Sequence, residues 1–226
     1  AIALICLPYV SLPLFWIFGR DRFHGYTVDR RLKDSSLEYL RKNTGSSSSI
    51  AKTAMSLDPA STRVLEDLAK MPFTFGNDVE LCINGDATFA AIFKGIEDSK
   101  DYLLIQFFIV HDDEIGKAFK NKLIEAAKRG VRIYFLYDEV GSHALPASYI
   151  AEIQMAGIAI HPFKTTKGAK NRLQINFRNH RKIVVVDGNI AFIGGHNVGD
   201  EYLGRDPKFG LWRDTHVRIK GPAILA

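Results

Sequence analysis

The sequence has little cysteine and no low-complexity segment. Its two cysteines, Cys6 and Cys82, are too few for a disulfide framework in 226 residues. Neither belongs to a CxxC pair or to a Cys/His cluster with the ligand spacing of a zinc site. The hydrophobic fraction of 46% and the charged fraction of 24% are those of a globular chain, which excludes a disordered, collagen-like or polytopic membrane protein.

Acidic residues are missing where basic residues gather. The chain has 30 basic and 25 acidic residues, a net charge of +5, and no acid occurs between Glu152 and Asp187. Such a segment favours an anionic partner (a phosphate, a nucleic acid or lipid headgroups), although a basic run is also typical of an ordinary exposed face. Seven basic residues lie in the segment: Lys164, Lys167, Lys170, Arg172, Arg178, Arg181 and Lys182.

Residues 1–18 are almost wholly apolar and end at Gly19-Arg20-Asp21-Arg22. About 20 apolar residues span a bilayer core, so we expect a truncated transmembrane segment rather than a signal-peptide core or a buried helix. The arginines that follow predict that the rest of the chain is cytoplasmic. Because the chain opens without methionine inside this run, we expect it to be a fragment.

Residues 19–74 predict a membrane-proximal region of short helices and linker. The serine run at 46–49 is typical of a flexible connection. A helix is expected to start at Ser61, with Val64, Leu65 and Leu68 on its buried side.

Residues 75–226 predict an α/β domain with a mixed, mainly parallel sheet flanked by helices. Apolar runs and amphipathic segments alternate along it, as in a sheet with helices packed on it. Strands are expected at 79–83 (closed by an Asn84-Gly85 turn), 102–110, 131–137, 158–162, 183–186 and 190–193, and helices at 87–97, 115–129 and 148–155.

The residues with recognisable chemistry surround the strand at 183–186. His180 and Lys182 are two residues apart and leave the same face of an extended chain, whereas Asp187 points the other way and lies about 23 Å from His180 along the strand. Asp187 is therefore expected to fix the Asp187-Gly188-Asn189 hairpin turn. Folding the hairpin at 188–189 places Asn197 opposite His180, and a one-residue shift places Gly195 there.

An imidazole, an ammonium and an amide that converge in this way suit an anionic phosphate. Lys182 and Asn197 can bind phosphate oxygens, and a neutral His180 can attack phosphorus. Taken singly, a histidine beside a basic run is more often a solvated surface residue, and it is the joint spacing that favours a site.

The spacing His180-x-Lys182, Asp187, Gly194-Gly195-x-Asn197 resembles the signature of the phospholipase D superfamily, and its version here is similar to that of bacterial cardiolipin synthases. The resemblance covers almost the whole chain. Besides the signature it includes Phe18-Gly19-Arg20, Asn84-Gly85, Asp138 with Gly141-Ser142, Asn176-Phe177-Arg178-Asn179, Gly199-Asp200-Glu201-Tyr202-Leu203-Gly204 and Trp212-Arg213-Asp214-Thr215-His216.

The resemblance implies a phosphatidyltransferase that makes cardiolipin and glycerol from two phosphatidylglycerol molecules through a phosphohistidine, with no metal and no cofactor. It implies that His180 is the nucleophile or its acid/base partner, and that Lys182, Asn197 and Gly195 lie at the phosphate. Asp187 belongs to the catalytic signature, but Asp214 matches the carboxylate that holds the histidine. The family often has serine where Gly195 stands, and His196 occupies a variable position to which we assign no role.

The family site uses two signatures, and this chain has one, since no other histidine begins His-x-Lys. We therefore expect a second half, in the same full-length chain or in a dimer partner, at the bacterial inner membrane. A phospholipase D-type phosphodiesterase or nuclease, or a non-catalytic module binding anionic lipid, are the alternatives. The apolar leader favours lipid over nucleic acid.

Overall fold

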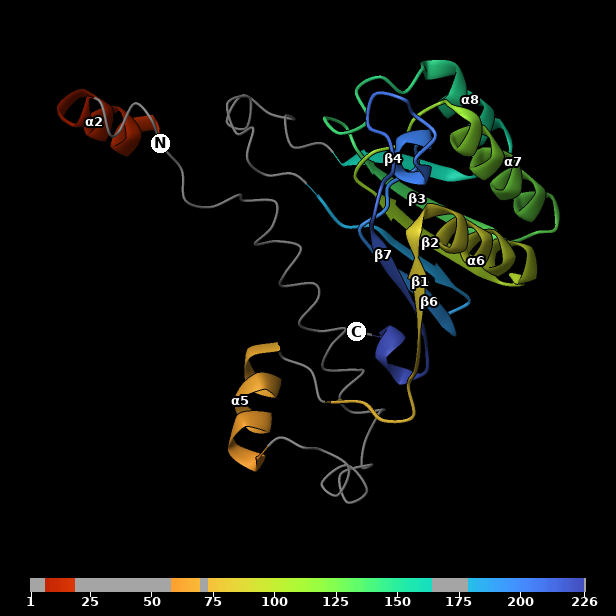
Figure 1. The fold of residues 1–226 in the computed structure, drawn as a ribbon, viewed down its shortest axis with the longest axis horizontal. Helices are drawn as coiled ribbons and strands as arrows, with labels where there is room; N and C mark the ends of the chain where they lie inside the picture. Colours follow the sequence, from red (N-terminus) through yellow and green to blue (C-terminus); the bar gives the residue numbers. More distant parts are fainter. Residues whose placement is uncertain (1–6, 19–57, 70–72, 164–178, 226) are drawn as a thin grey trace. The chain divides into compact units, whose positions relative to one another are not determined.

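The chain divides into two units, Ala1–Pro72 and Phe73–Ala226. The computed structural model describes residues 7–18, 58–69, 73–163 and 179–225 (Figure 1). Residues 164–178, which carry five of the seven basic residues in the predicted basic segment, lie outside the described residues. Each unit is described by itself.

The first unit contains the helices α2 (Pro8–Phe18) and α5 (Pro59–Ala69). Within the described ranges, no helix combines the length and the apolar character that crossing a bilayer requires. The transmembrane segment predicted over 1–18 is therefore not shown, and residues 1–6 lie outside the described part.

The helix expected from Ser61 begins slightly earlier, because Asp58 caps it. The Asp58 carboxylate accepts hydrogen bonds from the backbone N–H groups of Ala60 and Ser61, which satisfies donors that the first helical turn leaves free. Val64, Leu65 and Leu68 are exposed, so the expectation that they are buried is wrong.

The second unit is built on a seven-stranded sheet in the order β1-β7-β6-β5-β2-β3-β4. Its elements are β1 (Asp78–Ile83), α6 (Asn84–Asp98), β2 (Tyr102–Phe107), α7 (Glu114–Lys128), β3 (Arg132–Asp138), α8 (Ala147–Met155), β4 (Ala159–Phe163), β5 (Ile183–Val186), β6 (Ile190–Gly194), the 3-10 helix η1 (Asp200–Leu203), β7 (Thr215–Lys220) and the 3-10 helix η2 (Pro222–Leu225).

The sheet is mixed, as predicted, but its pairing is not mainly parallel. Only β2–β3 and β3–β4 are parallel, and the other described neighbours, β1–β7, β7–β6, β6–β5 and β5–β2, are antiparallel. The difference arises from the β5–β6 hairpin and from β7, a strand that the sequence analysis does not predict. Strand β7 returns beside β6 and joins β1 to the rest of the sheet.

Two predicted boundaries also change. The Asn84-Gly85 pair is not a turn between strand and helix, because α6 begins at Asn84, which itself has a left-handed φ of 65°. The strand predicted at 102–110 ends at Phe107, and beyond it only Val110 forms an isolated parallel bridge, to Val198.

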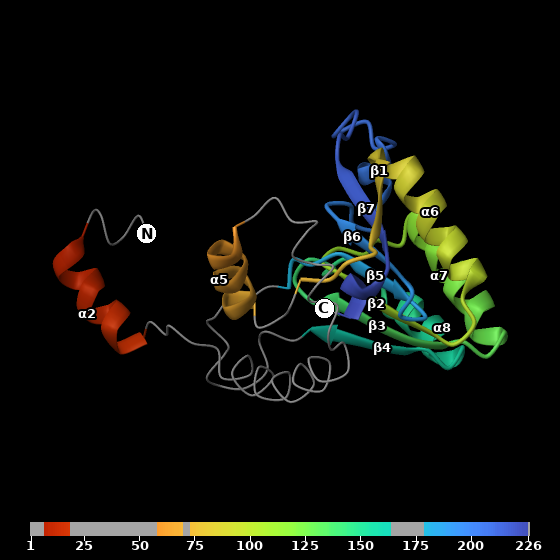
Figure 2. The same cartoon turned by 90° about the horizontal axis from the view of Figure 1, so that it is seen from below.

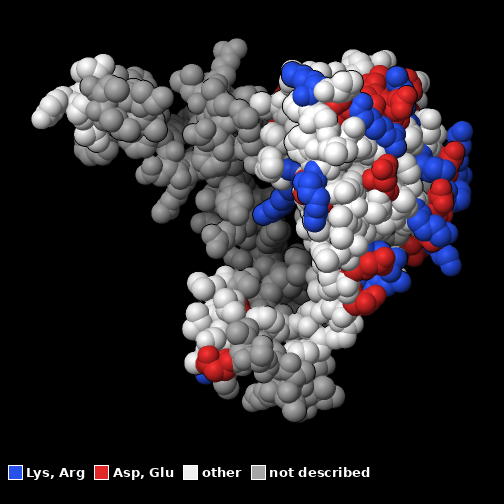
Figure 3. Space-filling view, in the orientation of Figure 1, with Lys and Arg blue, Asp and Glu red and all other residues white. Residues whose placement is uncertain are grey.

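The hydrophobic core lies between the sheet and the helices α6, α7 and α8, which cover the same face (Figure 2). Alternate residues of β2 point into it, and Leu103, Ile105 and Phe107 are all buried. Phe119 of α7 packs edge-on against Phe107, with ring centroids 5.7 Å apart. Basic and acidic side chains are interspersed over the outer, helical side (Figure 3).

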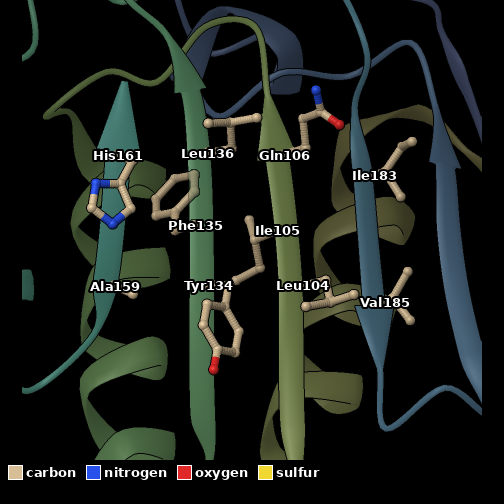
Figure 4. Close-up of a pocket in the computed structure, with 10 residues that line it drawn as sticks. All are labelled: Leu104, Ile105, Gln106, Tyr134, Phe135, Leu136, Ala159, His161, Ile183 and Val185. Atoms are coloured by element: carbon tan, nitrogen blue, oxygen red, sulfur yellow. The ribbon is translucent and has the colours of Figure 1, made fainter. Parts of the chain in front are cut away.

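The opposite face of the sheet bears a hollow of about 380 Å³ (Figure 4). It is lined by residues of strands β2 to β5, among them Leu104, Tyr134, His161 and Val185. None of its lining residues is a predicted site residue, so the candidate site lies elsewhere.

The β5–β6 hairpin confirms the predicted turn but shifts its register. Asp187 and Gly188 have φ values of 50° and 65°, and Asn189 N donates to Val186 O at 2.9 Å, so the turn residues are 187–188 rather than 188–189. Val186 pairs with Ile190 and Ile183 with Ile193. Continuing this register places His196 at the level of His180, between the predicted Gly195 and Asn197.

Asp187 has a structural task at this turn. Its carboxylate accepts three backbone N–H groups, from Lys100 at 2.9 Å, Asp101 at 2.9 Å and Tyr102 at 2.8 Å. Burial by itself would raise the pKa of Asp187, but these N–H groups and the Lys100 charge together hold the pKa below its usual value. The carboxylate therefore joins the hairpin to the start of β2, a structural role that the sequence predicted only for the turn itself.

We predict that Asp187→Asn lowers the free energy of unfolding by about 2 kcal/mol, because an amide cannot accept all three N–H groups and carries no charge. Urea unfolding measures this. The control is Asp101→Asn at the adjacent exposed residue, which should change stability by less than about 0.5 kcal/mol. Equal, small effects of the two substitutions would contradict the structural role.

Candidate functional site

The topology gathers the predicted site residues at one edge of the sheet. Strands β2, β3 and β6 end at this edge, and β5 and β7, which run the opposite way, begin there. Lys182 precedes β5, Asp214 precedes β7, and Gly195 follows β6. Asp187 lies at the other end of β5, so the structure does not bring this member of the signature to the cluster of site residues around Lys182 and Asp214.

Lys182 is the buried charge of the cluster. The residue is only 4% exposed, and its Nζ lies 2.8 Å from His180 O, 2.9 Å from His180 Nδ1 and 3.2 Å from His180 Nε2. Burial lowers the pKa of Lys182 to about 8, although the charge of Asp214 acts in the opposite direction. The Lys182 side chain is thus still mostly protonated at neutral pH, but it loses its proton at a lower pH than an ordinary lysine does.

His180 lies between Lys182 and an aromatic ring. Its imidazole centroid is 4.6 Å from that of Phe108, the residue directly after β2. Burial and the nearby Lys182 charge lower the pKa of His180, and Asp138 opposes the shift. A neutral imidazole has one acceptor nitrogen, so the Lys182 ammonium donates to one ring nitrogen at a time.

Asp138, at the carboxyl end of β3, anchors the segment that carries His180. It is 1% exposed, and its Oδ1 accepts the N–H groups of Val140 and Gly141 while its Oδ2 accepts Asn179 N at 3.0 Å. Asp138 is a residue of the site that was not predicted from the sequence. The signal was there, because an acid at the carboxyl end of a parallel strand lies where such sheets place their sites.

Asn197 is buried and already hydrogen-bonded. Its Oδ1 accepts Ile109 N at 3.0 Å, and its side chain hydrogen-bonds to Tyr202. The amide thereby joins the segment after β6 to the segment after β2, at the same edge as Lys182. No hydrogen bond between the described atoms links Asn197 to His180 or Lys182.

Gly195 and Asp214 are in direct contact. A Cβ at Gly195 would overlap the Asp214 carboxylate, so any side chain at this position would require Asp214 to move. Asp214 Oδ1 accepts Thr215 N at 2.7 Å, and Oδ2 accepts Trp212 Nε1 at 3.5 Å. Among the hydrogen bonds of the described residues, none joins Asp214 to His180.

Two buried histidines, His196 after β6 and His216 in β7, contact each other close to this position. Their Nδ1 atoms are 3.2 Å apart, so one must donate and the other accept, and Thr88 Oγ1 is 3.4 Å from His196 Nδ1. Both Nε2 atoms are buried and have no hydrogen-bond partner among the described residues. Burial lowers the pKa of both residues, that of His216 to about 4. Sequence spacing did not show this pair, because the β6–β7 register creates it.

Nothing in the described ranges groups three or more His, Cys, Asp or Glu side chains in a way that could hold a metal ion. The arrangement instead offers a neutral imidazole, a buried ammonium and an amide at one edge. The imidazole of such a set can attack an electrophilic centre that bears anionic oxygens, and the ammonium and the amide can bind those oxygens.

Comparisons with known proteins show which family the chain is similar to. The family model described as "Cardiolipin synthase, PLD-like domain" matches residues 92–220. "Cardiolipin synthase A" of Pseudomonas putida (strain GB-1) is 48% identical over 227 residues, which cover 99% of this chain and 47% of that protein. The protein of the same name from Pseudomonas fluorescens (strain SBW25) is 46% identical, with the same coverage. The chain thus spans about half the length of the curated relatives it matches.

A solved structure supports the fold alone. "NucT from Helicobacter pylori" superposes with a TM-score of 0.52 at 14% identity, covering 66% of this chain and 89% of that one.

We predict that His216 makes the protein acid-sensitive. Its pKa is near 4 in the fold and near 6.5 when unfolded, so its contribution to stability is complete above pH 6.5 and is lost as the pH falls towards 4. Between pH 7.5 and pH 5.0 the protein should lose about 2 kcal/mol of unfolding free energy through this residue.

Urea unfolding at the two pH values tests the prediction. His216→Asn should reduce the pH dependence, whereas His143→Asn, at an exposed histidine, should leave it as in the wild type. An unchanged pH dependence in His216→Asn would show that the prediction is wrong.

Proposed function

The chain belongs to the family of cardiolipin synthase PLD-like domains, and from this membership we propose that it is the first catalytic half of a phosphatidyltransferase. The reaction joins two phosphatidylglycerol molecules into cardiolipin and releases glycerol. The observation that carries the proposal is the Lys182 ammonium, buried 2.9 Å from the Nδ1 of an imidazole whose pKa is lowered.

In the first step the lone pair of a His180 nitrogen attacks the phosphorus of phosphatidylglycerol. The phosphorus–oxygen bond to the glycerol headgroup breaks, and the leaving oxygen takes a proton from a general acid, giving a phosphatidyl-histidine and free glycerol. A low His180 pKa supports this step, because the imidazole must be neutral to attack.

Lys182 has two tasks in this proposal. Before substrate binds, its ammonium occupies the acceptor nitrogen of His180. When a phosphate arrives, the ammonium turns to a non-bridging oxygen, which frees the lone pair and neutralises the charge that builds in the transition state. Asn197 is held beside the same edge, and its amide nitrogen has a second hydrogen for a phosphate oxygen.

In the second step the hydroxyl of another phosphatidylglycerol loses its proton to a base and attacks phosphorus. The phosphorus–nitrogen bond breaks, and His180 is regenerated. We propose that the acid/base group comes from a second PLD-like half in the full-length chain or in a partner, since the relatives are about twice as long as this chain. Asp214 is proposed to stabilise the positive charge of the site through Lys182.

The proposed setting is the inner face of a bacterial cell membrane, where the anionic substrate resides. The reaction as written needs no metal and no cofactor.

Product analysis with the full-length protein and phosphatidylglycerol in detergent tests the proposal. We predict cardiolipin and glycerol in equal amounts, and at least a thousandfold lower rate, as an order of magnitude, for His180→Ala. His143→Ala, at an exposed histidine whose ring nitrogen contacts Val140 O and no predicted site residue among the described hydrogen bonds, should retain the wild-type rate.

Phosphatidic acid in place of cardiolipin would identify a phospholipase, and nicked DNA would identify a nuclease. No turnover of any of these substrates would identify a binding module. Wild-type cardiolipin formation by His180→Ala would refute the nucleophile.

A further inference from the structure

A loop between η1 and β7 exposes apolar side chains beside the site. We define the 204–213 loop as the residues from Gly204 to Arg213. Leu211 is 99% exposed and Phe209 is 48% exposed, although both lie within a few residues of Asp214. Large apolar side chains so exposed, close together and next to a site are typical of an interaction surface.

The loop is a built structure that presents these side chains. Asp206 organises its turn, with Oδ1 accepting Lys208 N at 2.8 Å and its carbonyl oxygen accepting Phe209 N and Gly210 N at 3.1 and 3.0 Å. Gly210 has a left-handed φ of 65°, which lets the chain reverse between Phe209 and Leu211. The backbone of this turn therefore keeps the apolar tip of the loop, Phe209 and Leu211, exposed.

An aromatic cluster ties the loop to the domain. The ring of Trp212 packs edge-on against Tyr202 at 5.0 Å and against Phe209 at 6.2 Å. Tyr202 is buried, whereas Trp212 is only partly so, and Trp212 Nε1 reaches Asp214 at 3.5 Å. The loop is thus attached directly to a residue of the candidate site.

Basic residues surround the apolar tip. Lys208 and Arg213 are exposed, and Lys208 Nζ lies 5.4 Å from the centroid of the Phe209 ring. Arg205 is exposed too, but its guanidinium is paired with Asp86 at 3.3 Å and Glu114 at 4.0 Å. Asp206 is the one acidic residue in the loop, so its net charge is +2. An apolar tip with a partly exposed tryptophan and flanking basic side chains is the combination that binds the interface of an anionic bilayer.

We propose that the 204–213 loop enters an anionic phospholipid membrane, with Leu211 and Phe209 among the acyl chains and Lys208 and Arg213 at the phosphates. The choice of a membrane as partner rests on the proposed function. Leu211 is three residues from Asp214, a span of at most about 11 Å. The headgroup layer is about 5–8 Å thick on each side of the bilayer, so the loop places the site at the level of the lipid phosphates.

A fluorescent probe at the tip tests the insertion. In full-length protein with its other cysteines replaced, Leu211→Cys is labelled with the environment-sensitive dye NBD and mixed with vesicles of phosphatidylglycerol and phosphatidylcholine. The matched control carries the probe at Met155→Cys, a position on α8 that is 79% exposed and remote in sequence from the loop. Vesicles with nitroxide-labelled acyl chains then report the depth of the probe.

We expect the emission of the 211 probe to rise, to shift to the blue and to be quenched by the nitroxide lipids, and the 155 probe to stay unchanged. Vesicles of phosphatidylcholine alone should give a smaller response. No response at 211 in protein that co-sediments with the vesicles would overturn the proposal.

A parallel assay separates this inference from the proposed function. The double variant Phe209→Ser/Leu211→Ser should lose about tenfold of its turnover on bilayer phosphatidylglycerol and little on dispersed short-chain phosphatidylglycerol. Cardiolipin synthesis without probe insertion would refute membrane insertion of the loop but would leave the proposed function intact. Insertion without cardiolipin synthesis would refute the function and leave the loop as a membrane contact.

Discussion

The burial of a lysine ammonium against a histidine is the constraint on which the site depends. A buried charge is costly unless polar groups surround it, and Lys182 finds these in the carbonyl oxygen and ring nitrogens of His180. Burial lowers the pKa of both residues, and the Lys182 charge adds to the shift at His180. Asp138 holds the backbone next to His180, so the two side chains keep their places when no substrate is present.

The mixed topology of the sheet explains why these residues meet. Strands β2, β3 and β6 end at the edge where β5 and β7 begin, so five strand ends contribute to one small region. Gly194 and Gly195 let β6 approach β7 closely, because a Cβ at either position would overlap His216 or Asp214. The site is therefore an outcome of close backbone packing as much as of reactive side chains. A family relative about twice as long has room for a second such edge.

Much of this could be predicted from the sequence, for physical reasons that differ between elements. Strands β2, β3 and β5 could be predicted because they are apolar runs, as expected of strands buried on both sides. Helix α7 could be predicted because its apolar residues recur on one face. Strand period alone correctly separated Asp187 from His180 and Lys182. Strand β7 escaped prediction because the Thr215–Lys220 sequence carries two charges and is only half-buried. The predicted hairpin register was wrong by one residue because the turn lies at 187–188. The His196–His216 pair could not be predicted because it depends on the register between β6 and the unpredicted strand β7.

The most direct test of the central claim is the titration of Lys182 itself. Nitrogen-15 labelling of lysine side chains, with Lys182→Arg to assign the signal, allows the ammonium to be followed by NMR as the pH rises. Protonation of Lys182 should be half lost near pH 8, and the His180 pKa should lie below its ordinary value of 6.5. A Lys182 midpoint at or above the ordinary value of 10.5 would contradict the buried ammonium and the function built on it.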